Sequence, residues 1–195
     1  MADDWPKIKA RRNTTISPWV TIVEREVEFT PGAPVEIYHA VGQQDYIAIV
    51  ALTSDGRIPI VRQYRPALEQ FTWELPAGMV DKGESPADCC RRELLEETGF
   101  RAVTVHALGC YAPCTARLSN RVHSFFVATA ARTKVPATEA GIELGLVTPA
   151  ELGGLIQSGD FVLQLHIGAV LLAGLAGHIN LAALQGPDHS GPAKP

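Results

Sequence analysis

The sequence predicts a mixed α/β fold with a β-hairpin extension in front of the main domain. Short segments that alternate apolar and polar residues, or that are continuously apolar, indicate β-strands. Residues 85–99 carry the start and stop signals of a helix, and a second, more apolar helical pattern follows near the C-terminal end. With 195 residues, 46% of them hydrophobic, the chain is long enough for one domain with a core and an extension.

Residues 1–44 are predicted to form an N-terminal arm and a β-hairpin. The segment WVTIVEREVEF, from Trp19, alternates apolar and polar residues, and VEIYHAV, from Val35, follows a turn that contains Pro31 and Pro34. Two strand patterns joined by a turn indicate a hairpin. The basic residues in front of it are expected to form a solvated arm: Lys7, Lys9, Arg11 and Arg12.

Residues 45–183 are predicted to form the main domain, and residues 184–195, rich in Gly and Pro, a flexible tail. Strands are expected in YIAIVALTSDGRIPIVRQY (two), FTWELPAG, VTVHALGCYA, VHSFFVATAA and IELGLV, and a small helix in TPAELGGLIQSG. The apolar stretch that begins at Phe161 is interrupted by Gln164, His166 and other polar residues, which argues against a membrane span. A buried or dimer-facing helix is expected there instead.

Composition favours a cytoplasmic protein without nucleic-acid or membrane partners. The formal net charge of −4 and the isoelectric point near 5.9 argue against general nucleic-acid binding. The N-terminal residues are charged where a secretory signal needs an apolar core. The four cysteines show no zinc-type pairing with histidines and are expected to be reduced thiols: Cys89, Cys90, Cys110 and Cys114.

The segment GMVDKGESPADCCRRELLEETGF, from Gly78, is the most informative part of the chain. Ser85 suits a helix N-cap, Asp88 completes a capping box, and Gly99 is a natural C-terminal stop. Glu93 and Glu97 are four residues apart and therefore project from one helical face. Such crowded carboxylates predict a Mg²⁺ or Mn²⁺ site, and the alternative is a solvated acidic face.

This segment resembles the signature of the Nudix hydrolases, G-x5-E-x7-R-E-U-x-E-E-x-G-U, in which U is a bulky apolar residue. The resemblance implies an α/β/α sandwich around a mixed β-sheet, and hydrolysis of a nucleoside diphosphate linked to another moiety. The matching positions are Gly78, Glu84, Arg92, Glu93, Leu94, Glu96, Glu97, Gly99 and Phe100.

The resemblance also implies roles for individual residues. Glu93 and Glu97 match the main metal ligands, with Glu96 as a supporting ligand and the Ala77 carbonyl as a backbone ligand; the metal is expected to be Mg²⁺, with Mn²⁺ as the other candidate. Gly78, Glu84 and Arg92 are expected to hold the loop against the helix. The general base is expected in the loop KVPATEAGIELG, which offers Glu139 and Glu143, and Glu139 is preferred.

A second stretch, VRQYRPALEQFTWELPAG, resembles the ADP-ribose and ADP-sugar pyrophosphatase branch of this family. In that branch the N-terminal sheet exchanges across a homodimer, so a homodimer is expected. By the same resemblance Arg65 is expected to contact phosphate or ribose, and Glu74 to contact the ligand or hold the loop. Trp19 and Tyr38 resemble the aromatic pair that sandwiches adenine.

Three functions are compatible with these patterns. The first is hydrolysis of ADP-ribose or an ADP-sugar to AMP and a sugar phosphate. The second is the same chemistry on another nucleotide sugar, such as GDP-mannose or UDP-glucose, because these substrates differ in the pocket and not in the signature. The third is a non-catalytic nucleotide sensor, which typically lacks signature carboxylates, and all of them are present here.

Overall fold

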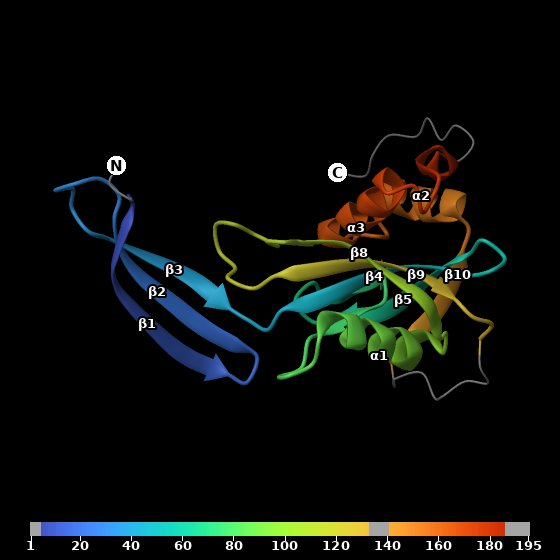
Figure 1. Ribbon diagram of the computed structural model, residues 1–195, viewed down its shortest axis with the longest axis horizontal. Coiled ribbons are helices and arrows are strands. Elements are labelled where there is room, and N and C mark those ends of the chain that lie inside the picture. Colours follow the sequence, from blue (N-terminus) through green and yellow to red (C-terminus); the bar gives the residue numbers. More distant parts are fainter. Residues whose placement is uncertain (1–4, 133–140, 186–195) are drawn as a thin grey trace. The chain divides into compact units, whose positions relative to one another are not determined.

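The computed structural model describes residues 5–132 and 141–185 of the chain (Figure 1). The predicted base Glu139 and most of the predicted tail lie outside these ranges. The strands are β1 (Lys7–Ser17), β2 (Val20–Glu28), β3 (Glu36–Gly42), β4 (Tyr46–Leu52), β5 (Ile58–Arg65), β6 (Gln70–Glu74), β7 (Ala77–Met79), β8 (Ala102–Tyr111), β9 (Val122–Thr129) and β10 (Glu143–Val147). The helices are α1 (Pro86–Thr98), α2 (Pro149–Ser158), α3 (Gln164–Leu175) and the 3₁₀ turn η1 (Leu181–Leu184).

The chain forms two compact units. One contains Met1–Asp45 together with Tyr111–Arg121, and the other contains Tyr46–Cys110 together with Val122–Pro195. The loop 111–121 joins the first unit through backbone bonds to β3, since the Val41 N–H donates to the Arg117 carbonyl at 2.7 Å and the Ser119 N–H to the Val41 carbonyl at 3.1 Å.

The first unit is a three-stranded antiparallel sheet in the order β1-β2-β3. The expected hairpin is present as β2 and β3. The basic residues expected in a solvated arm are exposed, but they lie on a third strand, β1. The basic side chains of β1 face acidic ones of β2: Lys9 pairs with Glu28 at 2.6 Å, and Arg12 with Glu24 at 2.9 Å. Opposite charges across neighbouring strands stabilise such a pairing.

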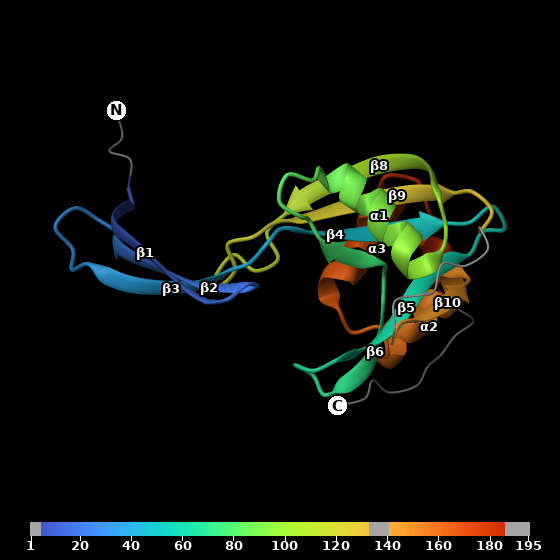
Figure 2. The ribbon, with the colours of Figure 1, turned by 90° about the horizontal axis from the view of Figure 1, so that it is seen from below.

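The second unit contains two sheets. In the sheet ordered β7-β4-β9-β8, β4 runs parallel to β9 and antiparallel to β7, so this sheet is mixed. The other sheet is antiparallel, in the order β10-β5-β6, and Figure 2 shows β5 and β6 joined as a hairpin with β10 on the other side of β5.

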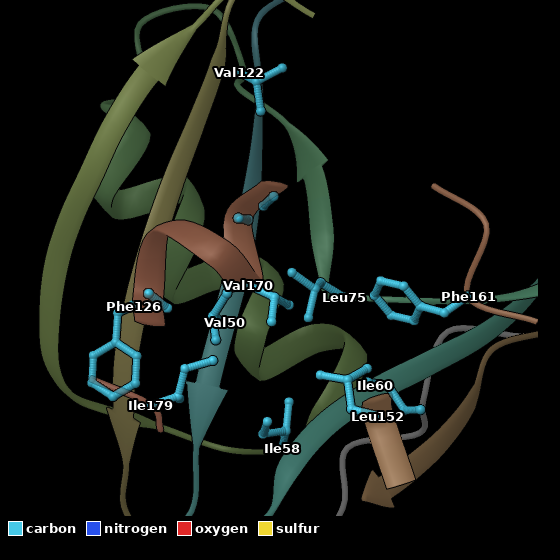
Figure 3. Close-up of a cluster of buried hydrophobic side chains, with 13 residues drawn as sticks. Val50, Ile58, Ile60, Leu75, Val122, Phe126, Leu152, Phe161, Val170 and Ile179 are labelled. Atoms are coloured by element: carbon cyan, nitrogen blue, oxygen red, sulfur yellow. The ribbon is translucent and has the colours of Figure 1, made fainter. Parts of the chain in front are cut away.

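Strand β4 divides the core of this unit into two layers. Its residues Ile47 and Ile49 pack in the cluster that contains Leu94 of α1, whereas Val50 packs in the cluster that contains Val170 of α3 (Figure 3). Because successive side chains of a strand point to opposite faces, α1 covers one face of the mixed sheet and α3 the other. This arrangement confirms the expected α/β/α sandwich.

Helix α1 begins and ends at the predicted residues. The Ser85 hydroxyl accepts a hydrogen bond from the Asp88 N–H at 3.1 Å, and Gly99 stops the helix with a left-handed φ of 72°. In contrast to the expected capping box, the Asp88 carboxylate accepts from the Ser85 hydroxyl, at 2.6 Å.

On the same helix, burial raises the pKa of the Cys89 and Cys90 thiols to about 12, which keeps both protonated.

The apolar C-terminal stretch forms a shorter helix than its composition suggests. Helix α3 ends at Leu175, followed by Gly177 with φ of 77° and by the turn η1. It buries His166, Ala169, Val170 and Ala173. Within the described ranges, none of the helices has the length and apolar character needed to span a membrane.

Candidate active site

The connection between β6 and β7, with the sequence Glu74-Leu75-Pro76-Ala77, is held by four different elements of the second unit. Each of its residues contacts a different one of these elements, so the connection is held from four directions. The contacts are Glu74 with Arg65 of β5, the Leu75 N–H with His166 Nδ1 of α3 at 3.1 Å, the Pro76 carbonyl with the Ile49 N–H of β4 at 3.0 Å, and the Ala77 N–H with the Glu97 carboxylate of α1 at 3.0 Å.

A cavity of about 440 Å³ lies beside this connection. It brings together side chains from three elements that the sequence separates, including the two glutamates that the signature places on one helical face. Its lining consists of Gln63, Tyr64 and Arg65 of β5, Ala77, Gly78 and Met79 of β7, Glu93 and Glu97 of α1, and Gly141 and Ile142.

Gly78 leaves space for the carboxylate of Glu93. A Cβ atom at Gly78 would lie 2.0 Å from Glu93 Oε1 and 2.1 Å from its Cδ, which is closer than real contacts allow. The absence of a side chain therefore lets the strand β7 approach the face of α1 that carries the glutamates.

Arg92 binds several acidic groups around the loop before α1. Its guanidinium donates to Glu84 at 2.9 Å through both Nε and Nη2, to Glu93 at 2.7 Å and to Glu96 at 3.2 Å. Hydrogen bonds from Arg92 lower the pKa of Glu84 from 4.5 to about 2. The geometry agrees with the loop-holding role expected for Glu84 and Arg92.

Arg65 and Glu74 form a bidentate pair at the edge of the cavity. Arg65 donates from Nε at 2.7 Å and from Nη2 at 2.5 Å, and the Thr72 hydroxyl adds a third bond to the same carboxylate at 2.6 Å. Burial alone would raise the pKa of Glu74, but the bonds from Arg65 and Thr72 outweigh it, and the pKa is lowered. Glu74 therefore orients Arg65 from behind, with the guanidinium at the cavity wall.

The cavity suits a hard divalent cation through part of the expected ligand set. Glu97 is 4% exposed and Glu93 is nearly buried, and both line the cavity beside the Ala77 backbone. Carboxylate and backbone oxygens are the ligands that Mg²⁺ and similar ions prefer. The Glu96 side chain is 54% exposed and does not line the cavity. Among the described residues, no cluster of three acidic, His or Cys side chains is already arranged around a single point.

Trp19 and Tyr38 both lie in the first unit, but apart from each other. Trp19 is 59% exposed and lines a depression of about 390 Å³ together with Arg25 and Gln44. Tyr38 pairs with Arg25 along the sheet, six positions from Trp19, which corresponds to roughly 20 Å of strand. One chain therefore does not stack both rings on one base, and the predicted adenine sandwich stays a prediction.

Some residues that line the cavity or that contact Tyr38 in the first unit were not predicted from the sequence. Gln63 lines the cavity, and its position two residues before Arg65 on a strand is the signal that could have indicated it. In the first unit, Arg117 lies over the Tyr38 ring, 5.4 Å from its centroid, while the Tyr38 hydroxyl donates to the Ala116 carbonyl at 2.9 Å. No local pattern in the sequence indicates these contacts, because 78 positions separate Tyr38 from Ala116 and 79 separate it from Arg117.

The layered α/β fold thus places a cavity lined by Glu93 and Glu97 beside β7 and α1. A family model for the NUDIX domain matches residues 42–163. The chain belongs to the Nudix family. This confirms the membership that the signature from Gly78 to Phe100 predicts.

Relatives of known activity and a solved structure resemble the chain over most of its length. An ADP-ribose pyrophosphatase from Mycobacterium tuberculosis is 34% identical over 145 residues, which cover 72% of this chain and 70% of that protein. A CMP-5′-(N-acetyl-N-hydroxy-3-aminopropyl)phosphonate hydrolase from Streptomyces rubellomurinus is 32% identical over 164 residues, covering 83% and 79%. The crystal structure of an ADP compounds hydrolase aligns with a TM-score of 0.75 and 19% identity, covering 92% of this chain and 100% of that one, a likeness that concerns the fold.

Proposed function

We propose that the protein hydrolyses the diphosphate of ADP-ribose, or of a related ADP-sugar, to AMP and a sugar phosphate, with Mg²⁺ as the cofactor. The observation that carries this proposal is the cavity in which the carboxylates of Glu93 and Glu97 lie together with the guanidinium of Arg65. Carboxylates suit a cation, and a guanidinium suits the phosphate oxygens on the other side of that cation. The name of the relative from M. tuberculosis supports the choice of substrate.

The charged residues of the cavity have distinct tasks in this proposal. Glu93 and Glu97 hold the cation, and the Ala77 backbone completes the wall that faces it. When bound, the cation neutralises the charge of the diphosphate and acidifies the attacking water. Arg65 orients the substrate through charge-assisted bonds, and its bidentate bond to Glu74 keeps the guanidinium in place.

The first unit is proposed to complete the site across a cytoplasmic homodimer. This unit leaves large apolar side chains exposed, among them Ile16, Trp19 and Ile37. Several exposed large apolar side chains on one small unit favour a protein partner over solvent. In this arrangement Trp19 of one protomer and Tyr38 of the other would enclose the adenine, which agrees with their separation within one chain.

A second candidate is a cytidine nucleotide linked to a phosphonate. The relative from S. rubellomurinus, whose name describes such a substrate, matches a larger share of the chain than the ADP-ribose pyrophosphatase does. The signature carboxylates would serve both reactions, since both activate water toward a phosphorus atom. The nucleobase is therefore the feature that separates the two candidates.

A substrate panel tests the proposal. Purified protein is incubated with ADP-ribose, ADP-glucose, GDP-mannose, UDP-glucose and a CMP-phosphonate ester, with Mg²⁺ or with EDTA, and the nucleotide products are separated by chromatography. The proposal expects AMP from ADP-ribose only in the presence of Mg²⁺, with the highest kcat/KM of the panel. Preferred turnover of the cytidine compound would favour the second candidate. Absence of turnover with all five would contradict both.

A further inference from the structure

His166 is a fully buried imidazole that the proposed chemistry does not use directly. It lies in the first turn of α3, is 0% exposed, and accepts a hydrogen bond from the Leu75 N–H through Nδ1 at 3.1 Å. The two residues are 91 positions apart in the sequence. The bond therefore ties the C-terminal helix to the connection that carries Ala77.

The imidazole serves at this place as a neutral acceptor. Because Nδ1 accepts from Leu75, the ring proton resides on Nε2. Burial lowers the pKa of His166 to about 4, which keeps the ring neutral at physiological pH. Nε2 is buried and has no hydrogen-bond partner within the described ranges, so the ring carries a desolvation cost that an apolar side chain would avoid. What the imidazole adds over an apolar residue is the acceptor Nδ1.

His166 Nδ1 accepts from one of the two backbone N–H groups that follow Glu74 in the connection, those of Leu75 and Ala77. Strand β6 ends at Glu74 and β7 begins at Ala77, so the Leu75 N–H lies between the two strands. Pro76 has no N–H. Leu75 and Ala77 thus supply the two donors of the connection beyond Glu74, and α3 takes the first while Glu97 of α1 takes the second.

The side chain of Leu75 reinforces the same anchoring. It is fully buried in the cluster that α3 contributes to, with Phe161 and Val170 beside it (Figure 3). Packing alone fixes this side chain but leaves its N–H without an acceptor, and a buried donor of that kind is costly. His166 therefore satisfies the backbone at a point where apolar packing cannot.

We propose that His166 is a positioning residue, whose bond to Leu75 sets the place of Ala77 opposite Glu97 and of Glu74 behind Arg65. The inference rests on the proposed function, because the groups it positions are those of the proposed site. It assigns to α3, a helix outside the signature, a part in holding the cavity. Residues that orient metal ligands or their neighbours affect activity without touching the substrate.

Two variants of matched shape test the proposal. His166→Asn places a carbonyl oxygen near the position of Nδ1, whereas His166→Leu has the same branching without an acceptor. Amide exchange of Leu75, followed by NMR in the metal-free protein, measures the bond itself. Turnover of ADP-ribose with Mg²⁺ gives kcat and KM, and thermal unfolding shows whether each variant folds.

The proposal expects the leucine variant to lose protection at the Leu75 amide and to lose about tenfold or more in kcat, with a smaller change in KM. The asparagine variant is expected to restore both the protection and most of the kcat. Wild-type kcat in the leucine variant, or an equal loss of kcat in both variants with Leu75 still protected, would overturn it.

If His166→Leu does not fold, His166→Asn alone tests the positioning role of His166. It must then keep Leu75 protected and retain kcat within a few fold of the wild type, and a large loss of kcat with Leu75 protected would refute the positioning role. Absence of turnover in the wild-type protein would instead contradict the proposed function. In that case the exchange of the Leu75 amide still reports whether His166 fixes the connection.

Discussion

The carboxylate of Glu97, in the last turn of α1, accepts a hydrogen bond from the backbone N–H of Ala77 at 3.0 Å. This bond joins the signature helix to the first residue of β7, 20 positions before Glu97 in the sequence. The Glu97 side chain is 4% exposed and lines the cavity, and this hydrogen bond from the Ala77 backbone fixes its position there.

Gly78→Ala is expected to displace Glu93 and reduce kcat by about 100-fold, since misplacement of a catalytic group by an ångström can have an effect of this size. The added Cβ would lie 2.0 Å from Glu93 Oε1, but that atom ends a flexible side chain, so the protein should still fold. Steady-state kinetics with ADP-ribose and thermal unfolding measure the two effects separately.

The control for this variant is Gly154→Ala. Gly154 lies within α2, and a Cβ there would meet no atom within 4 Å apart from those of the local helix backbone. This substitution should leave kcat unchanged and stabilise the protein by up to about 1 kcal/mol, because alanine is the better helix former. Equal kcat in the Gly78 and Gly154 variants would argue against the fitted contact.

Arg65→Ala is expected to destabilise the protein by about 2–4 kcal/mol, because among the described residues it leaves the buried Glu74 carboxylate a hydrogen bond from the Thr72 hydroxyl alone. Adding Glu74→Gln to this variant should recover part of the loss, since no unpaired charge then remains buried. Chemical denaturation of the single and double variants measures both free energies.

An exposed ion pair supplies the comparison. Glu143 pairs with Arg62 at 3.2 Å near the surface, and Glu143→Gln should cost less than about 1 kcal/mol. If Arg65→Ala costs no more than Glu143→Gln, the buried pair does not stabilise the cavity wall in the way described.

Acid should destabilise the metal-free protein partly through Glu84. Its pKa is lowered from 4.5 to about 2 by hydrogen bonds from Arg92, so the folded state binds fewer protons than the unfolded state between these values. The stability that Glu84 contributes is therefore fully present above about pH 5 and is lost as the pH falls from about 4.5 toward 2. Glu84→Gln should make the decline shallower in this window, measured by urea unfolding in EDTA; an unchanged slope would contradict the pairing.

The sequence predicted the parts of this fold that depend on neighbouring residues. Helix α1 starts at Ser85 and stops at Gly99 as expected, since capping and glycine stops act within a few residues. Strand β1 was missed because its basic residues are stabilised by acidic residues of β2, and periodicity does not reveal such pairing.

In the candidate site, too, the features set by neighbouring residues were predicted and the contacts between distant residues were not. The signature places Glu93 and Glu97 on one face of α1, and both line the cavity. The bond between Leu75 and His166 joins distant parts of the chain, so it becomes visible only once the sheet and α3 are assembled. Whether Glu96 takes part in metal binding stays a prediction, because its side chain lies toward Arg92 and solvent.

The role of Glu97 in holding the cation is tested by the turnover of ADP-ribose by the wild type, Glu97→Gln and Glu96→Gln at increasing Mg²⁺ concentrations. Glutamine at position 97 can still accept from the Ala77 N–H, so the fold should persist while the charge that holds the cation is lost. The account predicts equal amounts of AMP and ribose 5-phosphate from the wild type, at least about 100-fold lower kcat in Glu97→Gln, and a smaller loss in Glu96→Gln. Near-normal turnover by Glu97→Gln at saturating Mg²⁺ would contradict it.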